Sequence, residues 1–191
     1  MEVKIINYQD NWQAVKDAAM NTIGSDSGKY PSQAWKWKIL KAEHSPIRLI
    51  ELTVRMIDIP YWCSVHLVRH KFGVEHFVET QRTDRTGIYR DNLPQGALVN
   101  HTMRINAQAL INISRKRLCH QASKETTAIW KEVIKAVSEV EPELAAVCVP
   151  DCIYRGCCNE MRPCGYVDSS VGSLHRLAYQ NGTGITIKST S

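Results

Sequence analysis

The sequence predicts an α+β fold, in which an antiparallel or mixed sheet packs against long helices. Residues 50–56 alternate between apolar and polar side chains, which is typical of a half-buried strand. Residues 102–120 and 124–140 repeat apolar side chains at helical spacing and predict two long helices. Strands and helices alternate without the regular period of βαβ units, which favours an α+β arrangement over a parallel sheet.

The other elements follow in chain order. We expect a strand over residues 2–8, a helix after Asp10 that ends near Gly24, a second helix over residues 32–43, and a helix from Pro60 to about His70. Residues 71–99 are mixed and polar, with turn signals at Gly87, Pro94 and Gly96. The inner face of the helix over residues 102–120 is expected to contain Ala107, Leu110, Ile111, Ser114 and Leu118.

Composition limits the function classes. The chain has 191 residues, and apolar residues make up 43% of it, which excludes a disordered protein. The net charge of +5 suits an anionic small molecule but is small for a nucleic-acid binder, so we consider nucleic acid an unlikely ligand. We find neither an apolar run of about eighteen residues nor an apolar signal core at the start, so we expect a cytoplasmic protein without membrane contact.

A polar cluster lies near the end of the helix that begins at Pro60. His66, Arg69 and His70 have the spacing of one helical face, and Lys71 extends the positive charge. Such a group can hold a phosphate or a diphosphate, although a solvated basic face is an equally good interpretation. In the next long helix, Asn106 and Arg117 lie eleven residues apart and so on one edge; alternatively, they are a helix-start residue and a surface charge.

These residues resemble the flavin-dependent thymidylate synthases over roughly residues 1–145. The family's His-Ser-Pro turn is matched by His44-Ser45-Pro46, its Arg-His-Arg motif by Arg69-His70-Lys71, and its Asn-Ala-Arg-x-Leu-x-Asn pattern by residues 106–112, followed by Arg117. Lys71 and Gln108 replace family arginines, and the segment between Arg82 and Asn106 is short, which indicates a divergent short member. The family serine aligns with Glu79 without a gap, or with Thr80 after a one-residue insertion; we prefer the second alignment.

The resemblance implies FAD-dependent, reductive C5 methylation of dUMP with methylenetetrahydrofolate and NADPH, by a homotetramer whose sites lie between subunits. It implies FAD binding by Ser45, Arg69, His70, Lys71, Asn106 and Asn112, and substrate binding by His66, Glu79, Thr80, Arg82 and Arg117. Arg117 would also be catalytic, because a fixed guanidinium can stabilise charge on the pyrimidine carbonyl. The alternatives are C5 modification of another pyrimidine nucleotide, and a catalytically silent nucleotide- or flavin-binding homologue.

Five of the seven cysteines lie between Cys148 and Cys164, so we separate residues 1–146 from a cysteine-rich tail, residues 147–191. Four thiolates can bind zinc or an iron–sulfur cluster, although the spacing matches no common zinc-ribbon pattern. Reduced structural thiols are the main alternative, and a disulfide is a third. The metal hypothesis predicts that at least three of these cysteines share one ion: Cys148, Cys152, Cys157 and Cys164.

Overall fold

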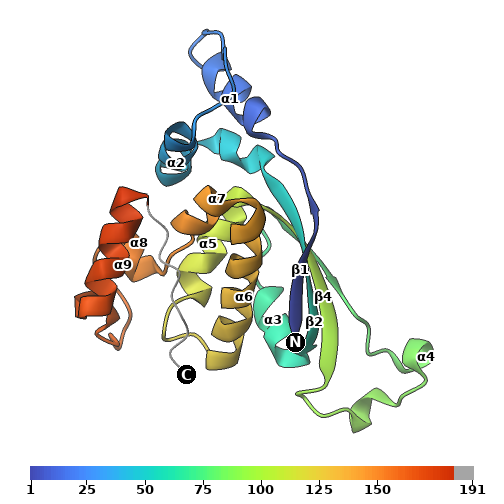
Figure 1. The fold of residues 1–191 in the computed structure, drawn as a ribbon. Coiled ribbons are helices and arrows are strands. Elements are labelled where there is room, and N and C mark those ends of the chain that lie inside the picture. The colour runs from blue at the N-terminus through green and yellow to red at the C-terminus, as the bar shows by residue number, and fades with distance from the viewer. Residues whose placement is uncertain (183–191) are drawn as a thin grey trace.

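A computed structural model describes residues 1–182, so the polar end of the tail lies outside the described residues. Within the described part, one antiparallel sheet has the order β1-β2-β4-β3 (Figure 1). Its strands are β1 (Glu2–Tyr8), β2 (Glu51–Pro60), β3 (Val74–Val78) and β4 (Leu98–Asn106). The helices are α1 (Trp12–Asn21), α2 (Gln33–Ala42), α3 (Tyr61–Leu67), α4 (Thr83–Thr86), α5 (Ala107–Arg117), α6 (Lys124–Val140), α7 (Pro142–Val147), α8 (Asp151–Arg155) and α9 (Ser170–Asn181), with 3₁₀ turns η1 (Ser45–Leu49), η2 (Arg90–Asn92) and η3 (Tyr166–Asp168). The expected α+β fold is confirmed.

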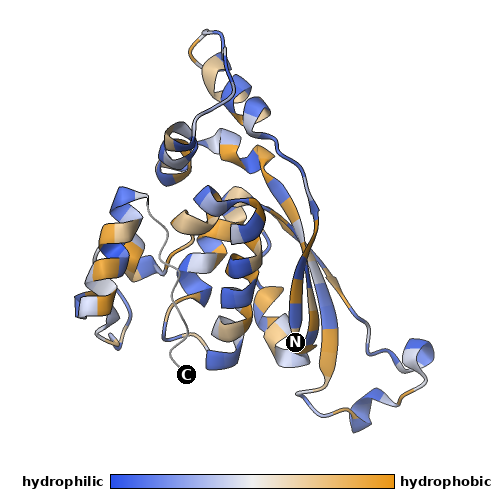
Figure 2. Ribbon diagram, in the orientation of Figure 1, coloured by the Kyte–Doolittle hydropathy of each residue, from blue (hydrophilic) through white to orange (hydrophobic). Residues whose placement is uncertain are grey.

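The core lies between one face of the sheet and the helices α3, α5 and α6 (Figure 1). Buried side chains of β2 stand opposite buried side chains of β4: Leu52 pairs with Ile105, and Val54 pairs with Met103. The intervening residues, such as Arg55 and Arg104, face the other side and are exposed, and Figure 2 shows the resulting alternation of apolar and polar residues along the strands. The period-two pattern of residues 50–56 therefore gave the buried face of β2 correctly.

The helix expected over residues 102–120 begins later in the structure than we predicted. Residues 98–106 form strand β4, and α5 begins only at Ala107, where the Asn106 side chain accepts a hydrogen bond of 2.9 Å from the Ala109 N–H. Val99, His101, Met103 and Ile105 are buried on one face at the period of a strand, which decides the conformation of this segment. The predicted inner face of the helix is otherwise correct, because Ala107, Leu110, Ile111 and Ser114 are buried.

The helix from Pro60 is shorter than expected, and the segment after it contains an unpredicted strand. α3 ends at Leu67, so Arg69 and His70 lie in the loop beyond it and share no helical face with His66. β3 then pairs with β4, and residues 79–97 form an arm between these two strands that carries α4 away from the sheet (Figure 1). We did not predict β3, because only Val74 in this short edge strand is fully buried.

A buried carboxylate ties β1 and α1 to the end of α6. Glu141 accepts hydrogen bonds from the Tyr8 hydroxyl and, at 2.8 Å, from the Trp12 indole N–H. Burial raises the pKa of Glu141, whereas these two donors lower it and so favour the charged form. This contact joins residues that are more than 120 positions apart in the chain.

The cysteine-rich segment packs against the rest of the chain through α8 and α9. Cys148, Val149, Ile153 and Tyr179 belong to the same buried cluster as the sheet residues. Lys41 of α2 lies over the Tyr179 ring and donates a hydrogen bond to the Gln180 carbonyl at 3.2 Å. The expected division at residue 147 stays a prediction. Among the described residues, every helix is too short or too polar to cross a membrane.

We predict that Trp12→Phe lowers the free energy of unfolding by about 1.5–3 kcal/mol more than Trp37→Phe does, because it removes a hydrogen bond to a carboxylate. The indole N–H of Trp37 is buried without a hydrogen-bond partner among the described residues, so its loss removes no such bond. Urea unfolding of both variants measures the difference. Equal destabilisation would contradict the role given to Glu141.

Candidate functional site

The candidate site is built on the loop between α3 and β3, residues 68–73. Three backbone carbonyls in and beside this loop each accept a hydrogen bond from a different part of the chain. Arg117 of α5 donates to the His66 carbonyl at 2.7 Å, His76 of β3 lies 2.8 Å from the His70 carbonyl, and the Asn106 backbone N–H lies 3.0 Å from the Gly73 carbonyl. The backbone is held from inside the protein, whereas the side chains of Arg69, Lys71 and Phe72 are exposed, Phe72 to 95%.

Arg117 and His70 form the central contact of the site. The Arg117 Nε–H donates to His70 Nε2 at 2.9 Å, so this ring nitrogen carries no proton and the neutral imidazole carries its proton on Nδ1. Burial, together with the charge of Arg117, lowers the pKa of His70 to about 4. Burial and the Arg69 charge also lower the pKa of Arg117. The site therefore presents a fixed guanidinium beside a neutral imidazole.

The exposed side of the loop borders a shallow hollow of about 170 Å³, here called the loop recess. It brings together four of the predicted cofactor-binding residues, which come from the loop and from α5. The residues that line it are Arg69, His70, Lys71, Phe72, Ala109, Asn112 and Ile113. His66 lies just inside, where its Nδ1 is 3.2 Å from the Thr126 hydroxyl and where burial lowers its pKa.

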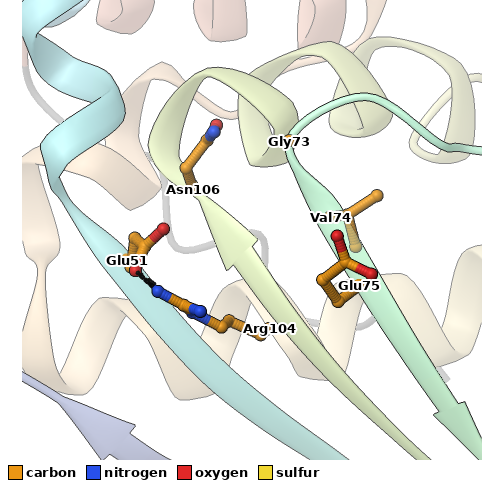
Figure 3. A pocket seen from close by; sticks show the side chains of 6 residues that line it. All are labelled: Glu51, Gly73, Val74, Glu75, Arg104 and Asn106. Carbon is orange, nitrogen blue, oxygen red and sulfur yellow. Dashed lines mark hydrogen bonds and ion pairs between the residues drawn. The ribbon is translucent and has the colours of Figure 1, made fainter.

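A second hollow, the strand recess, lies on the open face of the sheet and is lined by Glu51, Gly73, Val74, Glu75, Arg104 and Asn106 (Figure 3). Arg104 forms an ion pair with Glu51 across the neighbouring strands, and the figure shows Glu75 on β3 on the other side of Arg104. Asn106 thus lines this recess and caps α5. The structure places it apart from the other predicted cofactor-binding residues, on the far side of Gly73.

Six predicted cofactor- or substrate-binding residues line neither recess: His66 and Arg117, which are described above, and Ser45, Glu79, Thr80 and Arg82. Ser45 is exposed at the start of η1. Glu79 accepts a hydrogen bond from the Asn100 N–H at 2.8 Å, and Thr80 accepts one from the Arg82 N–H at 3.2 Å. Arg82 binds Asp84 with two nitrogens, at 3.0 and 2.8 Å, so within one chain its guanidinium faces a carboxylate and not the Arg117–His70 contact.

The structure does not support the predicted metal site at Cys148, Cys152, Cys157 and Cys164. Cys148 is buried beneath Ser114 and Arg115, where burial raises the pKa of its thiol to about 12, whereas Cys157 and Cys164 are exposed. Cys152 lies within the short helix α8, and Cys157 lies two residues beyond its end. In residues 1–182, no three cysteine, histidine or acidic side chains come close enough together to hold a metal ion.

The sequence analysis missed three residues beneath the loop: Ser64, His76 and His101. His101 and Ser64 are buried and hydrogen-bonded to each other at 3.0 Å, and His101 is 2.9 Å from His76. One feature of the sequence could have identified His101, namely its position in the alternating series Val99, His101, Met103 and Ile105. A polar residue at a buried strand position needs a hydrogen-bond partner.

We predict that Gly73→Ala is more destabilising than Gly87→Ala, although both glycines have φ of +72°. Each change carries the cost of a left-handed backbone, about 1–2 kcal/mol. At Gly73, the new Cβ would also lie 2.6 Å from the Asn106 side-chain nitrogen, whereas Gly87 has open space around it. Urea unfolding tests this difference, and an equal loss for both variants would contradict the close approach of Gly73 to Asn106.

We also predict that the protein loses stability as the pH falls from about 6.5 to about 4. Burial lowers the pKa values of His70 and His101 from the usual 6.5 of a histidine to about 4. In this window the unfolded chain takes up protons that the folded chain excludes, so unfolding is favoured. At pH 5, His70→Asn should reduce the proton uptake on unfolding by about one proton. An uptake equal to that of the wild type would contradict the burial of a neutral His70.

Solved structures with the same fold cover most of the chain. The flavin-dependent thymidylate synthase ThyX from Helicobacter pylori, complexed with FAD and dUMP, matches 78% of this chain and 100% of its own with a TM-score of 0.61 at 15% identity. A second structure of that enzyme with FAD and dUMP matches 78% of this chain and 99% of its own, with a TM-score of 0.60 at 15% identity. The UMP/dUMP methylase PolB from Streptomyces cacaoi, bound with 5-Br dUMP, matches 76% of this chain and 93% of its own, with a TM-score of 0.59 at 15% identity.

The family model for the thymidylate synthase complementing proteins, Thy1, matches residues 85–143, which include β4, α5 and α6. No protein with a curated description matches the sequence. The matched segment contains Asn106, Asn112 and Arg117, and therefore one side of the candidate site. By this match over residues 85–143 and by its fold, the chain is similar to the flavin-dependent thymidylate synthases.

Proposed function

We propose that this protein binds FAD and catalyses the reductive C5 methylation of dUMP, with methylenetetrahydrofolate as the one-carbon donor and NADPH as the reductant. The observation that carries the proposal is the arrangement at the loop recess, where exposed cations lie beside the fixed Arg117–His70 contact. The family match and the FAD and dUMP bound to structures of the same fold support it.

The cations of the loop recess differ from most other arginines of the site region. Arg82, Arg104 and Arg115 each form an ion pair, with Asp84, Glu51 and Glu43 respectively. Arg69 and Lys71 form no ion pair within the part of the chain that the structure describes. Their positive charge is thus available to an anionic ligand, and the diphosphate of FAD has the matching charge.

The proposed roles follow from the hydrogen-bonding capacity that remains at each residue. Arg69 and Lys71 bind the FAD diphosphate, Asn112 contributes amide hydrogen bonds, and His70 offers its Nδ1–H, which has no partner among the described residues. Arg117 uses Nε and one Nη in holding the loop, which leaves Nη1 for a carbonyl oxygen of the uracil ring. Bound FAD supplies the hydride chemistry that no amino-acid side chain provides.

The size of the loop recess favours a site completed by a second copy of the chain. Its volume of about 170 Å³ is below the range of about 300–1,000 Å³ that is typical of small-molecule pockets. FAD is larger than most such ligands, so one subunit offers only part of the contact surface. We propose the homotetramer that the family resemblance implies, in which Ser45, Glu79, Thr80 and Arg82 contribute to sites between subunits.

The nucleotide is the least determined part of the proposal. Thr80 and Arg82, the proposed contacts to the substrate, lie in an arm that departs from the family pattern, and Arg82 is already bound to Asp84. A structure of the same fold belongs to a methylase of UMP and dUMP. C5 modification of another pyrimidine nucleotide is therefore the second candidate.

Titration of the purified protein with FAD, and then with dUMP or UMP, tests the proposal through the flavin absorbance. We predict that Arg69→Ala weakens FAD binding by about 1.5–3 kcal/mol, the value of one charge-assisted hydrogen bond. Lys116→Ala is the matched control, because Lys116 is an exposed cation that lines neither recess.

The reaction itself is followed as reoxidation of reduced flavin and methylation of the nucleotide. Arg117→Lys should lower the turnover, because an ammonium keeps the charge but cannot donate in the forked geometry of a guanidinium. FAD binding without any nucleotide-dependent reoxidation would identify a silent homologue. Absence of FAD binding would overturn the proposal.

A further inference from the structure

A chain of three side chains runs beneath the loop recess and ends on the loop backbone. The Ser64 hydroxyl of α3 lies 3.0 Å from His101 Nδ1, and His101 Nε2 of β4 lies 2.9 Å from His76 Nδ1. His76 Nε2 of β3 lies 2.8 Å from the backbone carbonyl of His70. His101 is fully buried and Ser64 is 1% exposed, so water has little access to the inner part of the chain.

The acceptor at the loop end of these hydrogen bonds, the His70 carbonyl, determines which nitrogen of His76 carries a proton. The His70 carbonyl can only accept, so His76 must carry a proton on Nε2. In a neutral His76, Nδ1 is then an acceptor, which requires the proton of His101 to lie on Nε2. His101 Nδ1 is in turn an acceptor and receives the hydroxyl proton of Ser64. Every donor in the chain therefore points toward the loop.

Two charged arrangements would satisfy the same contacts. A cationic His101 could donate to both neighbours, but burial lowers its pKa to about 4. An additional proton on His76 would reverse the inner two hydrogen bonds, with His101 donating from Nδ1 to Ser64. Arg117 and Arg69 place positive charge beside this end, because Arg117 binds His70 and Arg69 precedes it, whereas Glu75 faces the other side of β3. None of the described hydrogen bonds of His76 involves a carboxylate. A proton on His76 would therefore lack a counter-charge, which favours the neutral chain.

We propose that Ser64, His101 and His76 are positioning residues that hold the His70 carbonyl through a chain of hydrogen bonds with one direction, and so fix the loop that carries Arg69 and Lys71. The effect of this hydrogen-bond chain on ligand binding rests on the proposed function. His70 is then held twice, by its carbonyl from β3 and by its ring from Arg117. Its Nδ1–H remains as a preorganised donor at the recess.

Imidazole ¹⁵N NMR of the full-length protein without ligand shows which ring nitrogens carry protons, and therefore the direction of the three hydrogen bonds. At neutral pH we expect His76 and His101 to carry their protons on Nε2 and His70 to carry its proton on Nδ1. A proton on Nδ1 of His101, or a charged His76, would overturn the proposal, because the donors would then point away from the loop.

Two substitutions of His101 separate positioning from packing. Glutamine has an N–H donor for His76 and an oxygen acceptor for Ser64, whereas phenylalanine fills the buried site without either. In His101→Phe, hydrogen exchange of the His70 amide, which bonds the Leu67 carbonyl at 3.0 Å, should become about five- to tenfold faster, as expected for one lost hydrogen bond. His101→Gln should restore most of the protection.

A role limited to packing predicts the opposite order, because a buried site accepts phenylalanine more readily than an amide. Faster exchange in His101→Gln than in His101→Phe, at equal global stability, would therefore overturn the proposal. Thr102→Val, on the next position of β4 and on the other face, is the matched control and should leave the exchange unchanged. These readouts need no flavin, so failure of FAD to bind the wild type would overturn the proposed function alone.

Discussion

The need to satisfy three backbone carbonyls in and beside one loop organises the whole candidate site. A hydrogen bond to a backbone carbonyl contributes about 0.5–1.5 kcal/mol, so the acceptors at His66, His70 and Gly73 tie the loop to the surrounding elements. The donors belong to Arg117, His76 and the Asn106 backbone, which lie on three different parts of the fold. The side chains of Arg69 and Lys71 are left exposed.

The path of β4 into α5 explains how one segment holds both ends of the loop. Asn106 ends the strand, caps the helix and meets Gly73, whereas Arg117 lies eleven residues further on and meets His66 and His70. Eleven residues of helix rise by about 16 Å, so α5 runs alongside the loop from one end to the other. The pairing of β3 with β4 adds the middle support, because it brings His76 next to His101.

Sequence patterns identified residues of the site where local spacing determines the geometry, but not the contacts that these residues make. Asn106 and Arg117 were expected on one edge of a helix, and the structure places them at its two ends, where each contacts the same loop. The predicted start of that helix was wrong. His101 and Met103 are buried on the sheet as part of a strand, so the helix begins only at Ala107. His76 could not be found from spacing, because its role comes from cross-strand pairing. Cysteines that are close in sequence are not brought together as the metal hypothesis requires, because Cys148 is buried whereas Cys157 and Cys164 are exposed.

Gln108, at the position where the resemblance leads us to expect an arginine, takes part in a network of charged contacts. Gln108 donates to one oxygen of Glu43 at 2.6 Å, and Arg115 binds the other oxygen of the same carboxylate. The Arg115 guanidinium in turn lies 3.6 Å from the centre of the Tyr154 ring, on α8. A neutral amide at position 108 leaves Glu43 to neutralise Arg115, and Arg115 then anchors the cysteine-rich segment by a cation–π contact. With Ile153 and Tyr179 in the common core, these contacts fix the segment by packing and charge.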